Sequence, residues 1–128
     1  MSYYFSKTLE TNFESGVQHA TEALKSHGFG IITQIDVKDT FKNKIGVDFR
    51  NYHILGACNP QLAHEALQIE DKVGTMLPCN VVVQDVGGGK VEVAAIDPVA
   101  SMMAIENPEL KHAAEMVREK LRSVIESL

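Results

Sequence analysis

The chain has 128 residues, with 12 Lys and Arg against 17 Asp and Glu, and a net charge of −5 when its histidines are neutral. This length is typical of one domain and is sufficient to bury a hydrophobic core, so we expect a single domain over residues 1–128. The acidic balance argues against a nucleic-acid partner, because phosphate recognition needs a basic face. Two cysteines are too few for a disulfide-stabilised scaffold.

The sequence contains no pattern that predicts association with a membrane. Residues 1–7 lack the apolar segment of a signal peptide, and the purely apolar runs extend over only a few residues. A membrane-spanning helix needs about 20 apolar residues. We therefore expect a soluble, cytoplasmic protein with reduced thiols and without a membrane partner.

The first quarter of the chain predicts a strand, a helix and a second strand. Residues 2–8 are rich in Tyr, Phe and Thr, as is typical of a strand. Asn12 is a suitable N-cap for an amphipathic helix that continues to about residue 26. Alternation of apolar and polar side chains over residues 29–37 predicts the second strand.

The next segment predicts a short helix, a strand and a longer helix. Asp39 is expected to cap the short helix, and Gly46 to end it. Residues 52–57 are rich in strand-forming side chains. Asn59 and Pro60 together mark a helix start, because asparagine caps well and proline lacks only an N–H that the first turn does not use.

The second half begins with a connection over residues 70–78 and continues with a β-hairpin. Residues 81–86 and 91–96 are strand-like, and three consecutive glycines (residues 87–89) join them. A short apolar stretch over residues 99–105 follows, and Asn107 with Pro108 repeats the cap-and-proline signal. The last helix carries one apolar stripe, which consists of Leu110, Ala114, Val117, Leu121 and Ile125.

This order of elements predicts an α+β fold, in which helices cover a mostly antiparallel sheet. An alternative is a parallel crossover between the third and fourth strands, since a helix lies between them in the sequence.

Cys58 and Cys79 are the main candidates for a functional site. Cys58 ends a predicted strand just before a helix start, where backbone N–H groups and the helix dipole favour a thiolate. Cys79 stands at the start of the hairpin. The alternative for each is a small buried hydrophobic residue, which is a common role of free cysteine.

The two cysteines are more informative as a pair, because each is followed by an asparagine, Asn59 or Asn80. If the third and fourth strands are antiparallel neighbours, both thiols lie at the same edge of the sheet. If a parallel crossover joins these strands, the thiols lie at opposite ends of the sheet. The topology therefore decides whether the pair can form one site.

A metal site would have to be assembled from separate elements, because no ligand-spacing motif is present. Its candidates are Cys58, Cys79 and His64, which lies one turn into the following helix. Asp97, a carboxylate at a strand end before Pro98, is a further candidate for ligand binding. The alternative for Asp97 is an ordinary Asp-Pro turn.

Three segments of the chain resemble a known family. Residues 47–60, which end in Gly-Ala-Cys-Asn-Pro, residues 77–83, which begin Leu-Pro-Cys-Asn-Val, and the dipeptide at residues 97–98 are similar to the bacterial and archaeal domain of unknown function 302. The resemblance covers essentially the whole chain. It implies a compact α+β domain with a curved antiparallel sheet, of TATA-binding-protein-like architecture, and it implies a homodimer. It does not imply DNA binding. It assigns no reaction and no cofactor.

The sequence leaves three hypotheses about function. The first is a homodimeric module that binds a small ligand or a metal, with Cys58, Asn59, Cys79, Asn80 and Asp97 as binding residues. The second is an enzyme of thiol redox chemistry or sulfur transfer that uses the two cysteines as catalytic groups. The third is a structural or interaction domain in which both cysteines only fill the core.

Overall fold

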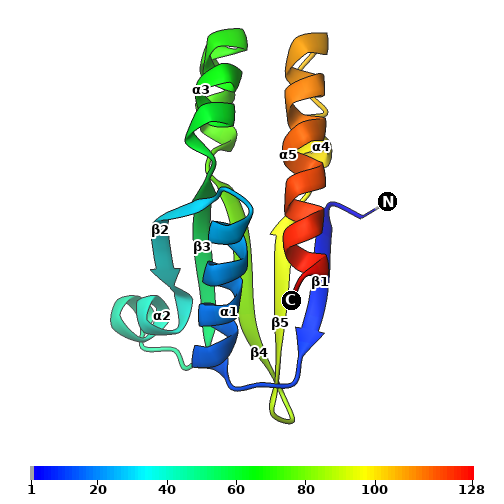
Figure 1. Cartoon of the computed structure of the whole chain (residues 1–128). Coiled ribbons are helices and arrows are strands. Elements are labelled where there is room, and N and C mark those ends of the chain that lie inside the picture. Colours follow the sequence, from blue (N-terminus) through cyan, green and yellow to red (C-terminus); the bar gives the residue numbers. More distant parts are fainter. Residues whose placement is uncertain (1) are drawn as a thin grey trace.

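The computed structural model describes residues 2–128 and contains a five-stranded antiparallel sheet packed with helices (Figure 1). The strands lie in the order β1-β5-β4-β3-β2, and each neighbouring pair is antiparallel. The predicted α+β fold is therefore confirmed, and the parallel crossover between the third and fourth strands is wrong. The strands are β1 (Tyr4–Leu9), β2 (Gly30–Asp36), β3 (Tyr52–Cys58), β4 (Cys79–Gly87) and β5 (Lys90–Ile96).

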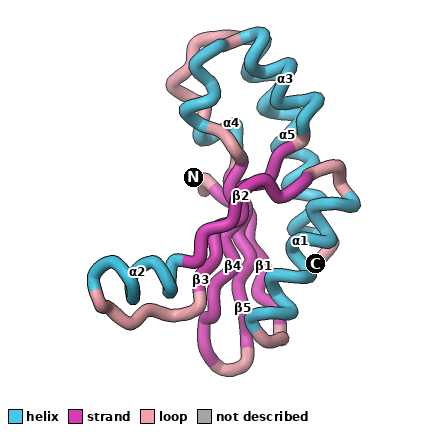
Figure 2. Tube along the Cα trace, turned by 90° about the vertical axis from the view of Figure 1, so that its left-hand side faces the viewer, coloured by secondary structure: helices cyan, strands magenta, loops and turns pink. Residues whose placement is uncertain are grey.

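The helices lie on both sides of the sheet and beyond one of its ends. The helical elements are α1 (Phe13–Ser26), α2 (Val37–Ile45), α3 (Pro60–Ile69), the 3-10 helix η1 (Asp71–Met76), α4 (Pro98–Ser101) and α5 (Pro108–Glu126). Helices α1 and α5 cover one face, and α2 projects from the opposite side of the sheet (Figure 2). Helix α3 and the first half of α5 extend past the end of the sheet, side by side (Figure 1).

Side-chain caps define where the helices begin. Asn12 accepts a hydrogen bond from the Ser15 N–H at 2.8 Å, as expected from the sequence. The sequence predicted Asp39 as the N-cap of the short helix, and this prediction is wrong, because the helix begins one turn earlier. Asp36 caps α2 instead, because its carboxylate accepts from the Asp39 N–H at 2.9 Å, and β2 consequently ends at residue 36.

The connection expected over residues 70–78 contains a helical segment that the sequence does not reveal. Residues 71–76 form η1, and the Leu77–Pro78 peptide bond is cis. Val73 in η1 is fully buried and packs with Ala66 of α3 and Leu110 of α5. Burial of this apolar side chain against α3 and α5 stabilises the helical conformation of the segment.

The core lies between the sheet and helices α1 and α5. Its centre consists of fully buried residues, which include Val81, Val83, Val93, Leu24 and Leu121. The intervening residues of the same strands point away from the helices, so the other face of the sheet is left uncovered by α1 and α5. Helix α1 approaches the sheet closely at Gly16, where an added Cβ would lie 2.6 Å from a methyl carbon of Val91.

Within residues 2–128, none of the helices combines the length and apolar character that are required to cross a membrane.

Candidate ligand-binding site

The sheet topology brings Cys58 and Cys79 to the same edge of the sheet. Cys58 is the last residue of β3 and Cys79 is the first residue of β4, and Cys79 is paired with Ala57 in the antiparallel ladder. Typical ladder spacings then place the two cysteine Cα atoms roughly 6 Å apart. Both cysteines are free thiols.

Residues Cys58 and Cys79 both line a cavity of about 290 Å³ at the point where the sheet ends and the paired helices continue. Because Ala57 is the direct partner of Cys79, the side chains of Cys58 and Cys79 leave the sheet on opposite faces. Helix α3 contributes Leu62, Ala63 and Ala66 to its wall, and α5 contributes Ala113 and Ala114. Because the facing helices carry alanines at these positions, their side chains do not fill the space between them. The cavity therefore results from small side chains on two helices that extend past the sheet.

The cavity wall is apolar, and part of it is exposed. Of its lining residues none is charged, and Asn59 is the one side chain with an amide. Two lining residues are substantially exposed, Ile32 of β2 at 60% and Leu67 of α3 at 40%. These two side chains mark where the cavity opens to solvent.

Burial changes the acid–base chemistry of Cys79. The residue is only 7% exposed. Burial raises the pKa of the Cys79 thiol from 9.0 to about 11, and the nearby Cys58 thiol adds to the increase through charge repulsion. At neutral pH Cys79 is therefore a protonated, weakly nucleophilic thiol.

Asn59 connects the cavity to the start of α3. Its side-chain oxygen accepts a hydrogen bond from the Leu62 N–H at 3.1 Å, which is the N-cap predicted from the sequence. The same residue lines the cavity directly after Cys58. Capping therefore fixes the orientation of the Asn59 side chain at the start of α3.

The structure does not bring Asn80 to this site. Asn80 follows Cys79 in β4 and is exposed, whereas Cys79 is buried. Successive strand residues point to opposite faces, so Asn80 lies on the uncovered face of the sheet. It lines a separate shallow depression there, with Tyr4, Tyr52 and Val82.

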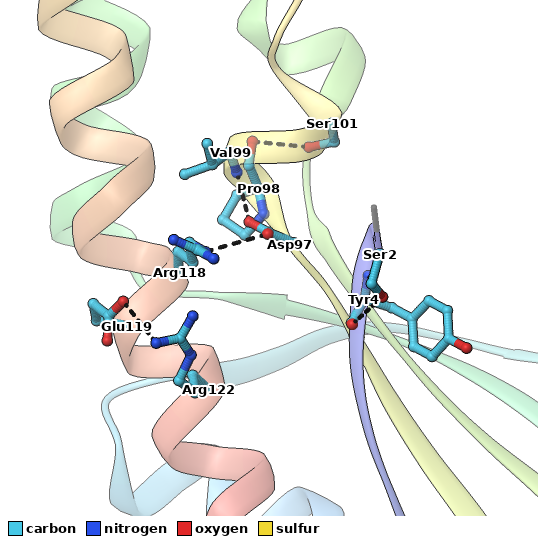
Figure 3. A network of polar contacts seen from close by, with 9 residues as sticks. All are labelled: Ser2, Tyr4, Asp97, Pro98, Val99, Ser101, Arg118, Glu119 and Arg122. Atoms are coloured by element: carbon cyan, nitrogen blue, oxygen red, sulfur yellow. Dashed lines mark hydrogen bonds and ion pairs between the residues drawn. The ribbon is translucent and has the colours of Figure 1, made fainter.

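Asp97 also lies outside the cavity wall and has a structural role. It is 6% exposed, and its carboxylate accepts from the Val99 N–H at 3.0 Å, which caps α4. Arg118 of α5 places its Nε 3.2 Å from the same carboxylate (Figure 3). Asp97 thus joins α4 to α5, while its neighbour Pro98 lines the cavity.

His64 is not placed to complete a metal site with the two thiols. It is exposed on α3 and is not among the residues that line the cavity. No cluster of three or more His, Cys, Asp or Glu side chains suited to a metal ion occurs in the part of the chain that the structure describes.

Two residues that matter for this site were not identified from the sequence. Met102 lines the cavity, although the sequence shows only that it belongs to a short apolar stretch. Arg118 pairs with Asp97 across 21 positions of the chain, and no local pattern signals such a contact. The apolar periodicity of α5 did identify the stripe that faces the core, where Leu110, Leu121 and Ile125 are buried.

Comparisons with known proteins agree over nearly the whole chain. A family model described as "Domain of unknown function DUF302" matches residues 5–128. A solved structure, "Crystal structure of uncharacterized conserved protein DUF302 from Bacillus stearothermophilus", is similar with a TM-score of 0.90. The two proteins are 28% identical, and the match covers 98% of each chain. A search of curated proteins found no match.

Proposed function

The chain belongs to the family described as Domain of unknown function DUF302, and we propose that it is a binding module whose cavity between α3 and α5 holds a small apolar ligand. The observation that carries this proposal is the apolar wall of a cavity whose exposed lining residues are Ile32 and Leu67.

The size and polarity of the cavity support this class of ligand. Sites for small molecules typically measure roughly 300 to 1,000 Å³ and are mostly apolar with a few polar groups. The present cavity, at about 290 Å³, lies at the lower end of this range. A dry apolar cavity of roughly 150 Å³ is sufficient for benzene. The ligand is therefore a compact ring or short chain, and Asn59 is the group available to orient a polar end.

The acid–base state of Cys79 favours binding over thiol catalysis. A catalytic cysteine needs a thiolate at working pH, which usually follows from a lowered pKa. The pKa of Cys79 is raised to about 11 instead. A cytoplasmic location, which we also propose, would keep both free thiols reduced.

We further propose that the module is a homodimer whose subunits meet through the uncovered face of the sheet. Ile54, Val82 and Ala94 form an apolar row across β3, β4 and β5 on this face. The nearby polar groups already pair with one another, since Arg50 donates to Gln84 at 2.9 Å and Gln84 donates to Glu92 at 3.0 Å. An apolar face with internally paired polar groups is suited to pack against an identical copy.

Filling the cavity tests the binding function. Ala63 lines it but is not fully buried, so Ala63→Leu places a larger side chain in the space at low cost to the fold. We expect wild-type protein to bind the neutral fluorophore 1-aminoanthracene saturably at one site. Ala63→Leu should weaken this binding at least tenfold, because the added carbon atoms occupy the ligand's volume. Fluorescence titration measures the affinity.

Ala104→Leu is the matched control, because Ala104 is exposed and does not line the cavity. It should bind the fluorophore as the wild type does, and circular dichroism should show that both variants are folded. Equal affinities of Ala63→Leu and wild type would exclude the cavity as the binding site.

A further inference from the structure

A second cavity adjoins the cavity between α3 and α5. Its volume is about 190 Å³, and it lies between residues 99–105 and the first two turns of α5. Three side chains line both cavities, namely Met102, Leu110 and Ala114. The two cavities are therefore neighbours that share part of their wall.

Met102 is the part of the shared wall that can move most readily. Leu110 and Ala114 are held in α5 and are buried, at 2% and 4% exposure. Met102 is only half-buried and follows directly after the end of α4. Methionine has an unbranched, flexible side chain that adapts to differently shaped neighbours. A change of its rotamer would connect the cavities, so that a ligand in the cavity between α3 and α5 extends into the second cavity.

Lys111 gives the second cavity a charge that the cavity between α3 and α5 lacks. Among the described residues that line the two cavities, it is the one charged side chain. It lies three residues before Ala114, so the two residues share one side of α5. Its ammonium forms no ion pair with any carboxylate of residues 2–128, although Glu115 follows it by one helical turn. The charge of Lys111 is therefore available to a ligand.

We propose that the ligand is an apolar monocarboxylate, whose hydrocarbon part fills the cavity between α3 and α5 and whose carboxylate pairs with Lys111. This inference rests on the proposed function, because it names the class of ligand that the cavity holds. The chain as a whole has a net charge of −5, which repels an anion, so binding a carboxylate needs a local cation. Lys111 is exposed, and its ammonium can pair with a carboxylate without the cost of burying both charges.

Asn59 is the other polar group that could meet the carboxylate. Its side-chain oxygen is already engaged in the cap of α3, and a carboxylate has no proton to donate to that oxygen. Its amide N–H groups are neutral donors, whereas the Lys111 ammonium is charged. A hydrogen bond between two charged groups is stronger than one with a neutral donor, which favours Lys111 as the partner of the carboxylate.

Competition of octanoate with 1-aminoanthracene for the full chain tests the proposal. We expect octanoate to displace the fluorophore from wild-type protein, and octanol serves as the uncharged reference with the same chain length. Lys111→Gln should weaken octanoate binding about threefold to fivefold, as fits an exposed ion pair, and should leave the affinities for octanol and the fluorophore unchanged. Lys120→Gln is the matched control, because Lys120 is exposed on the same helix and lines neither cavity.

The outcomes separate this inference from the proposed function. If the fluorophore binds but octanoate does not displace it, the cavity is a binding site and the carboxylate ligand is excluded. If Lys111→Gln and wild type bind octanoate equally, the assignment of the carboxylate to Lys111 is overturned. If neither the fluorophore nor octanoate binds to wild type, the proposed function fails as well. Ala63→Leu should lose both ligands, because its side chain fills the space that their hydrocarbon parts share.

Discussion

Cys79 is a titratable side chain whose acid–base behaviour is changed by burial. It is buried at the start of β4, and burial together with the neighbouring Cys58 raises its pKa to about 11. The protonated thiol is consequently favoured by the folded state and the thiolate by the unfolded state. Its ionisation is therefore coupled to the free energy of unfolding.

This coupling predicts a loss of stability at alkaline pH. Cys79 stabilises the fold fully below its unfolded pKa, and this contribution is lost as the pH rises from about 9 to about 11. The shift corresponds to about 2 to 3 kcal/mol. Urea unfolding under reducing conditions should show this decline in wild type, while Cys79→Ala lacks that part of it. Parallel pH profiles for the two proteins would contradict the raised pKa.

At the scale of elements, Asp97 holds α4 against α5 and so supports one side of the cavity. Its carboxylate both caps α4 and pairs with Arg118. Pro98, the first residue of α4, and Met102, the residue directly after α4, both line the cavity. A residue outside the site therefore determines where two lining residues stand.

Substitutions at Asp97 should separate these two roles. Asp97→Ala removes the cap and the charge and should destabilise the protein by about 2 to 3 kcal/mol. Asp97→Asn retains a capping side chain and should cost only about 1 kcal/mol, since a charged contact is worth more than a neutral one. Chemical denaturation measures both values. Equal losses in the two variants would show that the cap contributes nothing beyond the charge, and no loss in Asp97→Asn would show that the charge contributes nothing.

Local sequence signals predicted most of the elements. Asn59 with Pro60 and Asn107 with Pro108 mark the starts of α3 and α5, and the three glycines mark the β4–β5 turn. These signals depend on residues that are close in the sequence. The packing of α3 against α5 and the formation of η1 depend on contacts between residues far apart in the sequence, such as Val73 and Leu110. No local pattern encodes such contacts.

The site was predicted in part for the same reason. The placement of Cys58 and Cys79 at the same edge of the sheet follows once β3 and β4 are antiparallel, but the sequence left that topology open. Strand alternation alone could have separated Asn80 from Cys79, because adjacent strand residues face opposite sides. Met102 could not be placed, because its position depends on how α4 packs against α5.

At the scale of the whole molecule, the two faces of the sheet differ in what covers them. One face packs against α1 and α5, and the other carries the apolar row of Ile54, Val82 and Ala94 without these helices (Figure 2). The cavity lies beyond the end of the sheet, between α3 and α5. Dimer formation through the uncovered face of the sheet would therefore leave the cavity accessible.

The proposed homodimer predicts the mass of the protein in solution. Light scattering after size exclusion should give wild type at twice the chain mass of 14.1 kDa. Val82→Glu should shift the protein towards the monomer, because it places a charge in the centre of the uncovered face of the sheet. Met116→Glu introduces the same charge on α5 and should remain dimeric. A monomeric wild type at micromolar concentration would exclude the proposed dimer.

The central claim is that the cavity between α3 and α5 takes up a ligand, and the methionine methyl groups report on this directly. Met102 lines the cavity, whereas Met116 is exposed on α5 and does not. In NMR spectra of protein labelled with ¹³C at the methionine methyls, 1-aminoanthracene should shift the Met102 signal saturably and leave the Met116 signal in place. An unchanged Met102 signal, or equal shifts of both signals, would contradict the claim.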